Sequence, residues 1–306
     1  MRRLLVLGGT GMLGHRVAMA GATAPDVDTW VTVRTADGRD ARLPAEVVPP
    51  DRVVGGLDAA APEAEVVARL RALLHEVRPD VVVNCVGVVK QRPEGDDEAL
   101  IAAVNARFPH LLAAEAGAAR AALVHLSTDC VFDGTTGGYH EDDPVSATDA
   151  YGRSKAAGEP SGPMVCVLRT SMIGRELHGA NGLLEWFLAA PDPVPGWAGA
   201  RFSGLTTPVL ADVLVDLARR PEPLVGPFHV AADPIDKATL LELLVPRYRP
   251  GTTIVRRDEP VIDRSLDGGR FRAATGFRAP SWPTMVADLA ADPTPYDRWR
   301  TSWPTP

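Results

Sequence analysis

Tyr151 and Lys155 stand four residues apart in the stretch from Asp149 to Lys155, and in a helix their side chains would share one face. A phenol has an ordinary pKa of about 10, and a neighbouring ammonium favours the phenolate and lowers that pKa. Such a pair could transfer a proton near neutral pH. The same spacing also arises by chance in many helices, so other motifs must support the catalytic interpretation.

Thr128 lies 23 residues before Tyr151, at the end of a predicted strand over Leu123 to Ser127. The separation allows a loop and a helix to bring Tyr151 back beside Thr128. The two hydroxyl groups could then bond one carbonyl oxygen and stabilise the negative charge that develops on it during hydride attack. The alternative is a Ser-Thr-Asp turn that bonds only to its own backbone.

A glycine-rich run lies directly between the first predicted strand, Leu4 to Leu7, and the first predicted helix. Glycines there allow a tight turn and a close approach to a pyrophosphate, and the N-terminus of the helix offers free N–H groups. The spacing fits Gly-x-x-Gly-x-x-Gly from Gly8 or Gly-x-Gly-x-x-Gly from Gly9. The predicted cofactor contacts in this run are Gly8, Gly9, Thr10, Gly11, Met12, Leu13 and Gly14.

Arg34 follows the second predicted strand, about 20 residues beyond the glycine run. An acidic residue at this place would bind the ribose 2′-hydroxyl of NAD, whereas an arginine accommodates the 2′-phosphate of NADP. Arg34 therefore favours NADP(H), with NAD(H) as the other option. Asp58 is a candidate partner of the adenine amino group, or a helix N-cap. The fourth strand end should also meet the cofactor, through Asn84, Cys85, Val86 and Gly87.

Short β-branched runs alternate with longer Ala- and Leu-rich segments through the first half of the chain. This pattern is typical of βαβ units, and Val81 to Val83 lacks polar alternation, as in a strand buried on both faces. The predicted fold class is α/β, a Rossmann-type doubly wound parallel sheet with a smaller α+β substrate-binding region. Predicted strands cover 4–7, 29–33, 81–84, 123–127 and 165–169, and predicted helices cover 11–20, 63–77, 97–116 and 151–158.

Proline- and glycine-rich turns become frequent after Arg169, and they separate helical patterns over 208–219 and 237–245. We expect a dinucleotide-binding domain over residues 1–170 that also receives about 205–230. Residues 171–306 should form a mainly substrate-binding region. The aromatic residues of the tail after Asp292, among them Trp299 and Trp303, predict that this segment packs on the protein.

Composition and charge exclude several classes of protein. The chain has 306 residues, of which 45% are hydrophobic and 23% charged, and its net charge of -7 offers no basic surface to nucleic acid. No apolar run is long enough to span a bilayer. Three well-separated cysteines, Cys85, Cys130 and Cys166, fit a reducing cytoplasm better than a disulfide set. The seven histidines lack metal-ligand spacing, so no metal site is predicted.

Several motifs in one order carry a family resemblance. They are the glycine run, Asn84-x-x-Gly87, the run from Ser127 to Gly134 (Ser-Thr-Asp-Cys-Val-Phe-Asp-Gly), and the run from Tyr151 to Glu159. Together they resemble the extended short-chain dehydrogenase/reductases, and within them the dTDP-4-dehydrorhamnose reductases and related nucleotide-sugar reductases. The likeness covers about the first 170 residues and continues more loosely through 168–171 and 202–207.

The resemblance implies NADPH-dependent reduction of a keto group on a dTDP- or UDP-linked 4-keto-6-deoxysugar. In that mechanism Tyr151 donates the proton, Lys155 lowers its pKa and bonds the nicotinamide ribose, and Thr128 orients the carbonyl. Asn105 matches a position that supports a helix bend and a proton-relay water, although it could equally be an ordinary polar residue of a helix. A homodimer is a candidate assembly.

Asp129 and Arg201 are the remaining candidate substrate contacts, Arg201 through a diphosphate. Two departures from the family pattern leave the identity of the sugar open. Cys130 stands where the rhamnose-pathway enzymes commonly carry Tyr. The loop after Asn84 also differs, and it continues into further candidate contacts at Lys90, Gln91 and Arg92.

Three other functions compete with the reductase. A sugar 4,6-dehydratase needs an Asp-Glu pair directly after the threonine, and Asp129 is followed here by Cys130, which argues against dehydration. A 4-epimerase uses the same Tyr, Lys and glycine run with tightly bound NAD, but Arg34 and the Ser-Thr-Asp motif favour the reductase. A cofactor-binding regulatory subunit without turnover is the alternative of another class, and the complete Thr, Tyr and Lys set favours an enzyme over it.

Overall fold

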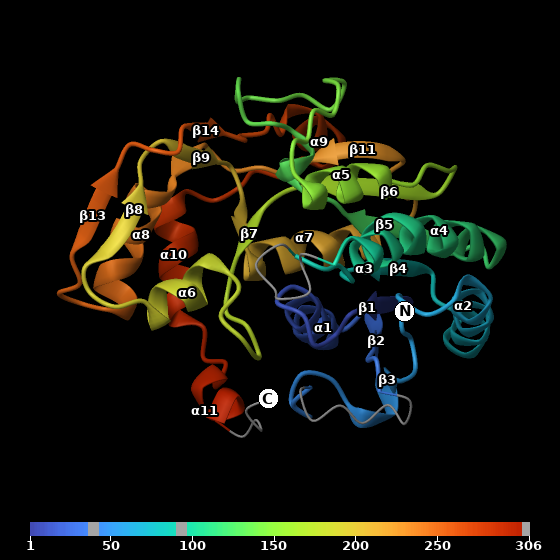
Figure 1. Cartoon of the computed structure of the whole chain (residues 1–306). Coiled ribbons are helices and arrows are strands. Elements are labelled where there is room, and N and C mark those ends of the chain that lie inside the picture. The colour runs from blue at the N-terminus through green and yellow to red at the C-terminus, as the bar shows by residue number, and fades with distance from the viewer. Residues whose placement is uncertain (36–42, 90–96, 302–306) are drawn as a thin grey trace.

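A computed structural model of the chain describes residues 1–35, 43–89 and 97–301 (Figure 1). The loop residues Lys90, Gln91 and Arg92, which the sequence offers as substrate contacts, lie outside the described residues, as does Trp303. No helix within the described ranges is both long and apolar enough to cross a membrane.

A seven-stranded sheet, in which every neighbouring pair is parallel, forms the centre of the first half of the chain. Its strand order is β11-β6-β5-β4-β1-β2-β3, so the order reverses between β1 and β4 and the carboxyl ends of these strands flank a ligand crevice. The predicted α/β doubly wound sheet is confirmed. The strands are β1 (Arg2–Leu7), β2 (Val27–Thr32), β3 (Val53–Val54), β4 (Val81–Asn84), β5 (Ala122–Leu126), β6 (Val165–Arg169) and β11 (Gly226–His229).

Two helical layers cover the sheet because its strands present apolar side chains to both faces (Figure 1). Leu4 and Val6 of β1 share one apolar core with α1 and α7, whereas Leu5 and Leu7 share the other with α2 and α4. These layers contain η1 (Pro50–Arg52), α1 (Gly14–Thr23), α2 (Glu63–Val77), α3 (Glu98–Ile101), η3 (Ala102–Arg107), α4 (Phe108–Ala118), η4 (Asp129–Val131), α5 (Ala150–Ala157) and α7 (Thr207–Arg219).

The predicted helix boundaries differ from the structure where the backbone forms a turn or a π-helix instead of a regular α-helix. Helix α1 begins at Gly14 rather than Gly11, because Gly11 to Leu13 form the turn that follows β1. The predicted helix over 97–116 is divided into α3, the π-helical η3 and α4. The prediction for α2 matches its observed bounds.

Most of the chain between β6 and its end builds a second region beside the sheet, seen at the left of Figure 1, while α9 (Gly269–Thr275) lies beside β11. It contains three small sheets, with the pairings β10-β7, β12-β9-β14 and β13-β8. Its elements are β7 (Met172–Ile173), α6 (Leu183–Ala189), β8 (Val194–Trp197), β9 (Ala200–Phe202), β10 (Leu205–Thr206), β12 (Ile235–Asp236), α8 (Lys237–Tyr248), β13 (Ile254–Arg257), β14 (Ile262–Asp263), α10 (Trp282–Ala291) and α11 (Tyr296–Thr301).

Two elements from this part of the sequence return to the first half. Helix α7 packs on α1, and β11 extends the large sheet by pairing with β6. The tail after Asp292 is also packed as far as it is described, since Tyr296 and Trp299 are buried.

Candidate active site

The glycine run forms a tight turn in which each glycine has a distinct reason. Gly8 has a φ of +84°, which favours glycine, and a Cβ on Gly14 would lie 2.1 Å from the carbonyl oxygen of Gly8. A Cβ on Gly11 would meet only that same oxygen, at 3.3 Å, so the chain there is open to a close ligand. The tight turn therefore depends on Gly8, the close approach on Gly11, and the packing of the helix on Gly14. This division favours the Gly-x-x-Gly-x-x-Gly spacing over Gly-x-Gly-x-x-Gly.

Gly9 is needed for packing, and its predicted contact with the cofactor stays a prediction. A Cβ at this position would lie 1.9 Å from a methyl group of Val31 on β2, so the glycine lets the turn sit directly on the sheet. No side chain caps the N-terminus of α1. Its first N–H groups therefore remain suited to an anion such as a pyrophosphate.

A cavity of about 710 Å³ opens beside this turn. Its first side, called here the glycine-loop wall, comprises Thr10, Gly11, Met12, Leu13, Cys85, Val86 and Gly87. Its other side, called the distal wall, includes Ser171, Met172, Asn181, Arg201, Phe202, Lys237 and Arg264. Thr128, Asp129, Cys130, Tyr151 and Lys155 line the floor between them. The cavity thus brings together most of the residues that the sequence proposed.

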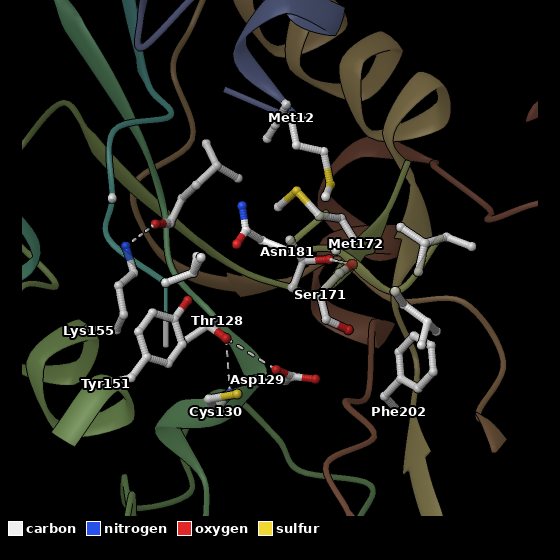
Figure 2. A pocket seen from close by; sticks show the side chains of 18 of the residues that line it. Met12, Thr128, Asp129, Cys130, Tyr151, Lys155, Ser171, Met172, Asn181 and Phe202 are labelled. Carbon is white, nitrogen blue, oxygen red and sulfur yellow. Dashed lines mark hydrogen bonds between the residues drawn. The ribbon is translucent and has the colours of Figure 1, made fainter. Parts of the chain in front are cut away.

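Helix α5 delivers Tyr151 and Lys155 to the cavity together with the end of β5 (Figure 2). The Asp149 carboxylate caps the helix by accepting from the backbone N–H of Gly152 at 2.7 Å. A Cβ on Gly152 would lie 2.2 Å from the carbonyl oxygen of Cys130, so this glycine lets α5 pack tightly against the turn that carries Thr128. Tyr151 and Thr128 both line this cavity, and the Thr128 hydroxyl is close enough to the phenol to affect its pKa.

Thr128 bonds within its own turn. Its Oγ1 accepts from the N–H of Cys130 and donates to Asp129, both at 3.1 Å. The local turn that the Ser-Thr-Asp motif allowed is therefore present, while the shared bonding of a substrate carbonyl by Thr128 and Tyr151 stays a prediction.

The pKa of Tyr151 shifts in the direction opposite to the prediction. Burial raises the pKa of the phenol, and the nearby Thr128 hydroxyl opposes this shift without cancelling it. The Nζ of Lys155 donates to the carbonyl oxygen of Leu126 at 2.6 Å. Burial lowers the pKa of Lys155 itself to about 8, against the opposing charges of Glu159 and Cys85. The phenol is thus protonated and the lysine is the group that titrates near neutral pH.

Asn105 is more than an ordinary polar residue of a helix. It is fully buried within the π-helical turn η3, where its Oδ1 accepts from the N–H of Val88 and its Nδ2 donates to the Val88 carbonyl, both at 2.9 Å. Nδ2 also lies 3.2 Å from the hydroxyl of Ser154 on α5. The side chain therefore joins the helix that carries Tyr151 to the loop that follows β4.

A buried ion pair, which the sequence did not predict, fixes the far end of α5. Glu159 follows this helix and accepts two hydrogen bonds from Arg169 of β6, at 2.9 and 2.8 Å. It also accepts from the hydroxyl of Ser127 at 2.6 Å. The ion pair connects the end of α5 to the ends of β5 and β6. The sequence did not reveal it, because Glu159 and Arg169 lie ten residues apart and belong to different elements.

Six predicted cofactor residues lie outside the cavity lining, the turn glycines Gly8, Gly9 and Gly14 among them. Arg34 is exposed at the end of β2. Asp58 is exposed and accepts from the N–H of Ala60 at 3.0 Å; the N-cap alternative is wrong, because α2 begins at Glu63 after Pro62. Asn84 is buried and orients the loop after β4, since its Oδ1 accepts from the N–H of Val86 at 3.0 Å.

The distal wall contains residues that sequence reasoning missed. Arg264 donates through Nε to the carbonyl of Phe132 at 2.9 Å and reaches the sulfur of Cys130 at 3.7 Å. The predicted Arg201 lies near Asp263, at 3.7 Å, and is half-exposed. Ser171 and Met172 follow the end of β6, and their place after a parallel strand could have predicted that they line the cavity. Nothing in the local sequence connects Arg264 with a turn more than 130 residues earlier. Within the described ranges, no group of three or more His, Cys, Asp or Glu residues could hold a metal ion.

Comparisons with known proteins agree with this arrangement. Residues 1–190 match the family described as the RmlD substrate binding domain. The "Probable dTDP-4,6-dihydroxy-2-methyloxan-3-one 4-ketoreductase" of Streptomyces antibioticus is 33% identical over 265 residues, which cover 80% of this chain and 77% of that protein. Methionine adenosyltransferase 2 subunit beta of Mus musculus is 32% identical over 163 residues, or 52% of this chain and 42% of that protein.

A solved structure with the same fold is dTDP-4-dehydrorhamnose reductase from Bacillus anthracis str. Ames in complex with NADP. It aligns with a TM-score of 0.76 at 18% identity and covers 96% of this chain and 100% of that chain. The parallel sheet with the glycine turn at its switch point defines a Rossmann-type α/β protein, the fold class of this solved structure. Because the family match spans more than half of the chain, the protein belongs to the RmlD substrate binding domain family.

Proposed function

We propose that this protein is an NADP(H)-dependent reductase of a keto group on a dTDP- or UDP-linked 4-keto-6-deoxysugar. One observation carries the proposal: the Tyr151 phenol, whose pKa is raised, and the Thr128 hydroxyl line the same cavity as the glycine turn. Two hydroxyl donors beside a dinucleotide site suit a carbonyl oxygen that gains negative charge. The names of the Streptomyces antibioticus and Bacillus anthracis proteins support this class of substrate.

The glycine turn and the N-terminus of α1 fit the pyrophosphate of a nicotinamide dinucleotide, which supplies a hydride when bound. Arg34 at the end of β2 supports NADP(H) over NAD(H). Asp58, Asn84 and the residues from Cys85 to Gly87 remain predicted contacts of this cofactor.

Tyr151 is the proposed proton donor. Burial raises its pKa and so keeps the proton available at neutral pH, which is the state that reduction consumes. Thr128 orients the carbonyl and shares its developing charge, with Asp129 beside it. Lys155 would bond the nicotinamide ribose and replace the proton through its own titration, while Asn105 holds the loop and helix in register.

The distal wall is the proposed sugar-nucleotide site. Arg201, Lys237 and Arg264 bring positive charge to the cavity, as a diphosphate requires. In this proposal residues 1–170, with about 205–230, bind the cofactor and 171–306 mainly bind the substrate. None of the three cysteines forms a disulfide within the described residues, which supports a cytoplasmic location, and a homodimer stays a prediction.

The test follows NADPH oxidation against a panel of dTDP- and UDP-linked 4-keto sugars. We expect turnover with at least one of them, and a loss of about 10²- to 10⁴-fold in kcat for Tyr151→Phe because the proton donor is removed. Tyr248→Phe is the matched control, since this phenol lies on α8 away from the cavity. Absence of oxidation with every sugar, or equal rates in wild type and Tyr151→Phe, would defeat the proposal.

Two outcomes would favour the other functions. NAD that survives dialysis of the purified protein indicates the 4-epimerase. The likeness to methionine adenosyltransferase 2 subunit beta supports the regulatory alternative, which would be favoured if Tyr151→Phe left the cellular function intact.

A further inference from the structure

The last described helix, α11, lies against the beginning of α1, although their sequences are about 280 residues apart. Tyr296 of α11 is 3% exposed, and its ring makes an edge contact with His15 at a centroid distance of 5.6 Å. Its hydroxyl lies 2.8 Å from Nε2 of His15. The other ring nitrogen, Nδ1, lies 2.8 Å from the carbonyl oxygen of Gly11. A chain of two hydrogen bonds therefore joins the C-terminal helix to the glycine turn.

The protonation of this chain follows from its partners. The Gly11 carbonyl can only accept, so Nδ1 of His15 must carry a proton. Burial lowers the pKa of His15 to about 4, so the ring is neutral and Nε2 accepts from the Tyr296 hydroxyl. The Tyr296 hydroxyl thus supplies the donor for Nε2 and stabilises the tautomer in which His15 holds the Gly11 carbonyl, at the position where the glycine turn is open to a ligand.

Further contacts hold the arm formed by residues 292–301 in the same place. Arg16, the neighbour of His15, pairs with Asp292 at 2.8 Å and donates to Thr294 at 3.1 Å. On the other side, Arg300 donates to the carbonyls of Glu176 and Gly179 at 2.8 and 2.7 Å. Glu176 lies in the cavity lining, and its carboxylate accepts from the N–H groups of Asn181 and Gly182.

We propose that the C-terminal arm is part of the cofactor site, and that Tyr296 is a positioning residue that sets the glycine turn through His15. This inference rests on the proposed function, because it assumes that the turn receives a dinucleotide. The arm contacts the glycine turn through His15 and the loop over 176–182 through Arg300. It therefore orders both before a ligand arrives, and preorganisation of this kind lowers the cost of binding.

The first experiment measures the Kd of NADPH by fluorescence titration. Tyr296→Phe removes one hydroxyl and retains the ring contacts with His15, Arg175 and Trp299. We expect a Kd about tenfold weaker, because a buried ring nitrogen loses its donor and the tautomer is no longer fixed. Tyr248→Phe is the control, since the described residues give the Tyr248 hydroxyl no hydrogen-bond partner, and its Kd should stay within about twofold of wild type.

A double-mutant cycle tests whether Tyr296 acts through His15. In a His15→Leu background, Tyr296→Phe should change the Kd by less than about twofold, because the chain is already broken. Additive effects of the two substitutions would overturn the route through His15. In turnover, Tyr296→Phe should raise the KM for NADPH and leave kcat unchanged, a split that a general loss of folded protein would not give.

Amide hydrogen exchange provides a readout that needs no cofactor. The amides of Gly11 to Gly14 should exchange faster in Tyr296→Phe than in wild type, while those of β5 should not change. Equal exchange in both proteins would overturn the inference even if NADPH binds. Conversely, wild type that binds neither NADPH nor NADH defeats the proposed function, while faster exchange in the variant would still show that the arm controls the turn.

Discussion

The glycine-loop wall comes from two short continuous runs, over 10–13 and 85–87, whereas the distal wall comes from residues spread between Ser171 and Arg264. The first wall follows the glycine turn, whose path depends on where a Cβ would collide, although side chains such as Met12 also line it (Figure 2). The second wall is made of side chains carried by several short strands and loops. A wall that follows one tight turn is set by local sequence, while a wall built from distant side chains exists only after the chain has folded.

The largest expected effect concerns the glycine-loop wall. Gly14→Ala places a Cβ 2.1 Å from the carbonyl oxygen of Gly8, so the turn must move. We expect the Kd of NADPH, measured by fluorescence titration, to weaken by about 100-fold. Gly117→Ala is the control, because a Cβ there meets nothing within 4 Å in α4. It should preserve the Kd and increase the free energy of unfolding by about 0.5–1 kcal/mol. Tight NADPH binding by Gly14→Ala would show that side chains, not backbone, define this wall.

The next prediction distinguishes the Lys155 ammonium on the floor of the cavity from the arginines of the distal wall. Lys155 has a pKa of about 8 and loses its charge as the pH rises through that value. We expect kcat/KM for the nucleotide sugar to fall about tenfold per pH unit above the pKa. The Tyr151 pKa is raised, so the phenol does not titrate in this range. Arg201 and Arg264 keep their charge throughout.

The matched variant for the pH profile is Lys155→Arg, whose guanidinium remains protonated. Its kcat/KM is expected to be lower than that of wild type but level between about pH 7 and 10. The same alkaline fall in both proteins would assign the titration to another group, and the contrast between the floor of the cavity and its distal wall would be lost.

The smallest effect concerns a single distal side chain. Arg264→Met removes the donor to the Phe132 carbonyl and one positive charge of the cavity. We expect the KM for the nucleotide sugar to rise about tenfold and the Kd of NADPH to stay within about twofold. Arg278→Met, at an exposed position outside the cavity lining, should alter neither value. An equal loss of cofactor affinity in Arg264→Met would mean that the two walls are not independent.

The sequence predicted the strands and helices of the parallel sheet well because hydrophobic periodicity and β-branched runs are local properties. It failed where backbone leaves the regular pattern. Gly11 to Leu13 turn instead of starting α1, and the π-helical turn around Asn105 divides the predicted helix over 97–116. Both departures lie beside the cavity, where close packing against another element decides the local geometry.

The sign of the Tyr151 pKa shift was also beyond local reasoning. Spacing places Lys155 on the same helical face, but it does not reveal that the ammonium bonds the Leu126 carbonyl or that the phenol is buried. Desolvation depends on everything that surrounds a group and opposes the effect of a single neighbour. The hydrogen bonds of His15 to Tyr296 and of Glu159 to Arg169 were hidden for the same reason.

By itself the sequence determined the α/β class, the glycine turn after β1, and the Thr, Tyr and Lys set, because each depends on residue type and short-range spacing. Only the tertiary structure decided which glycines pack against neighbouring backbone, in which direction the pKa values of Tyr151 and Lys155 shift, which side chains form the distal wall, and that the C-terminal arm contacts the glycine turn through His15. These features depend on burial and on contacts between segments as much as 280 residues apart, and no local pattern of residues records them.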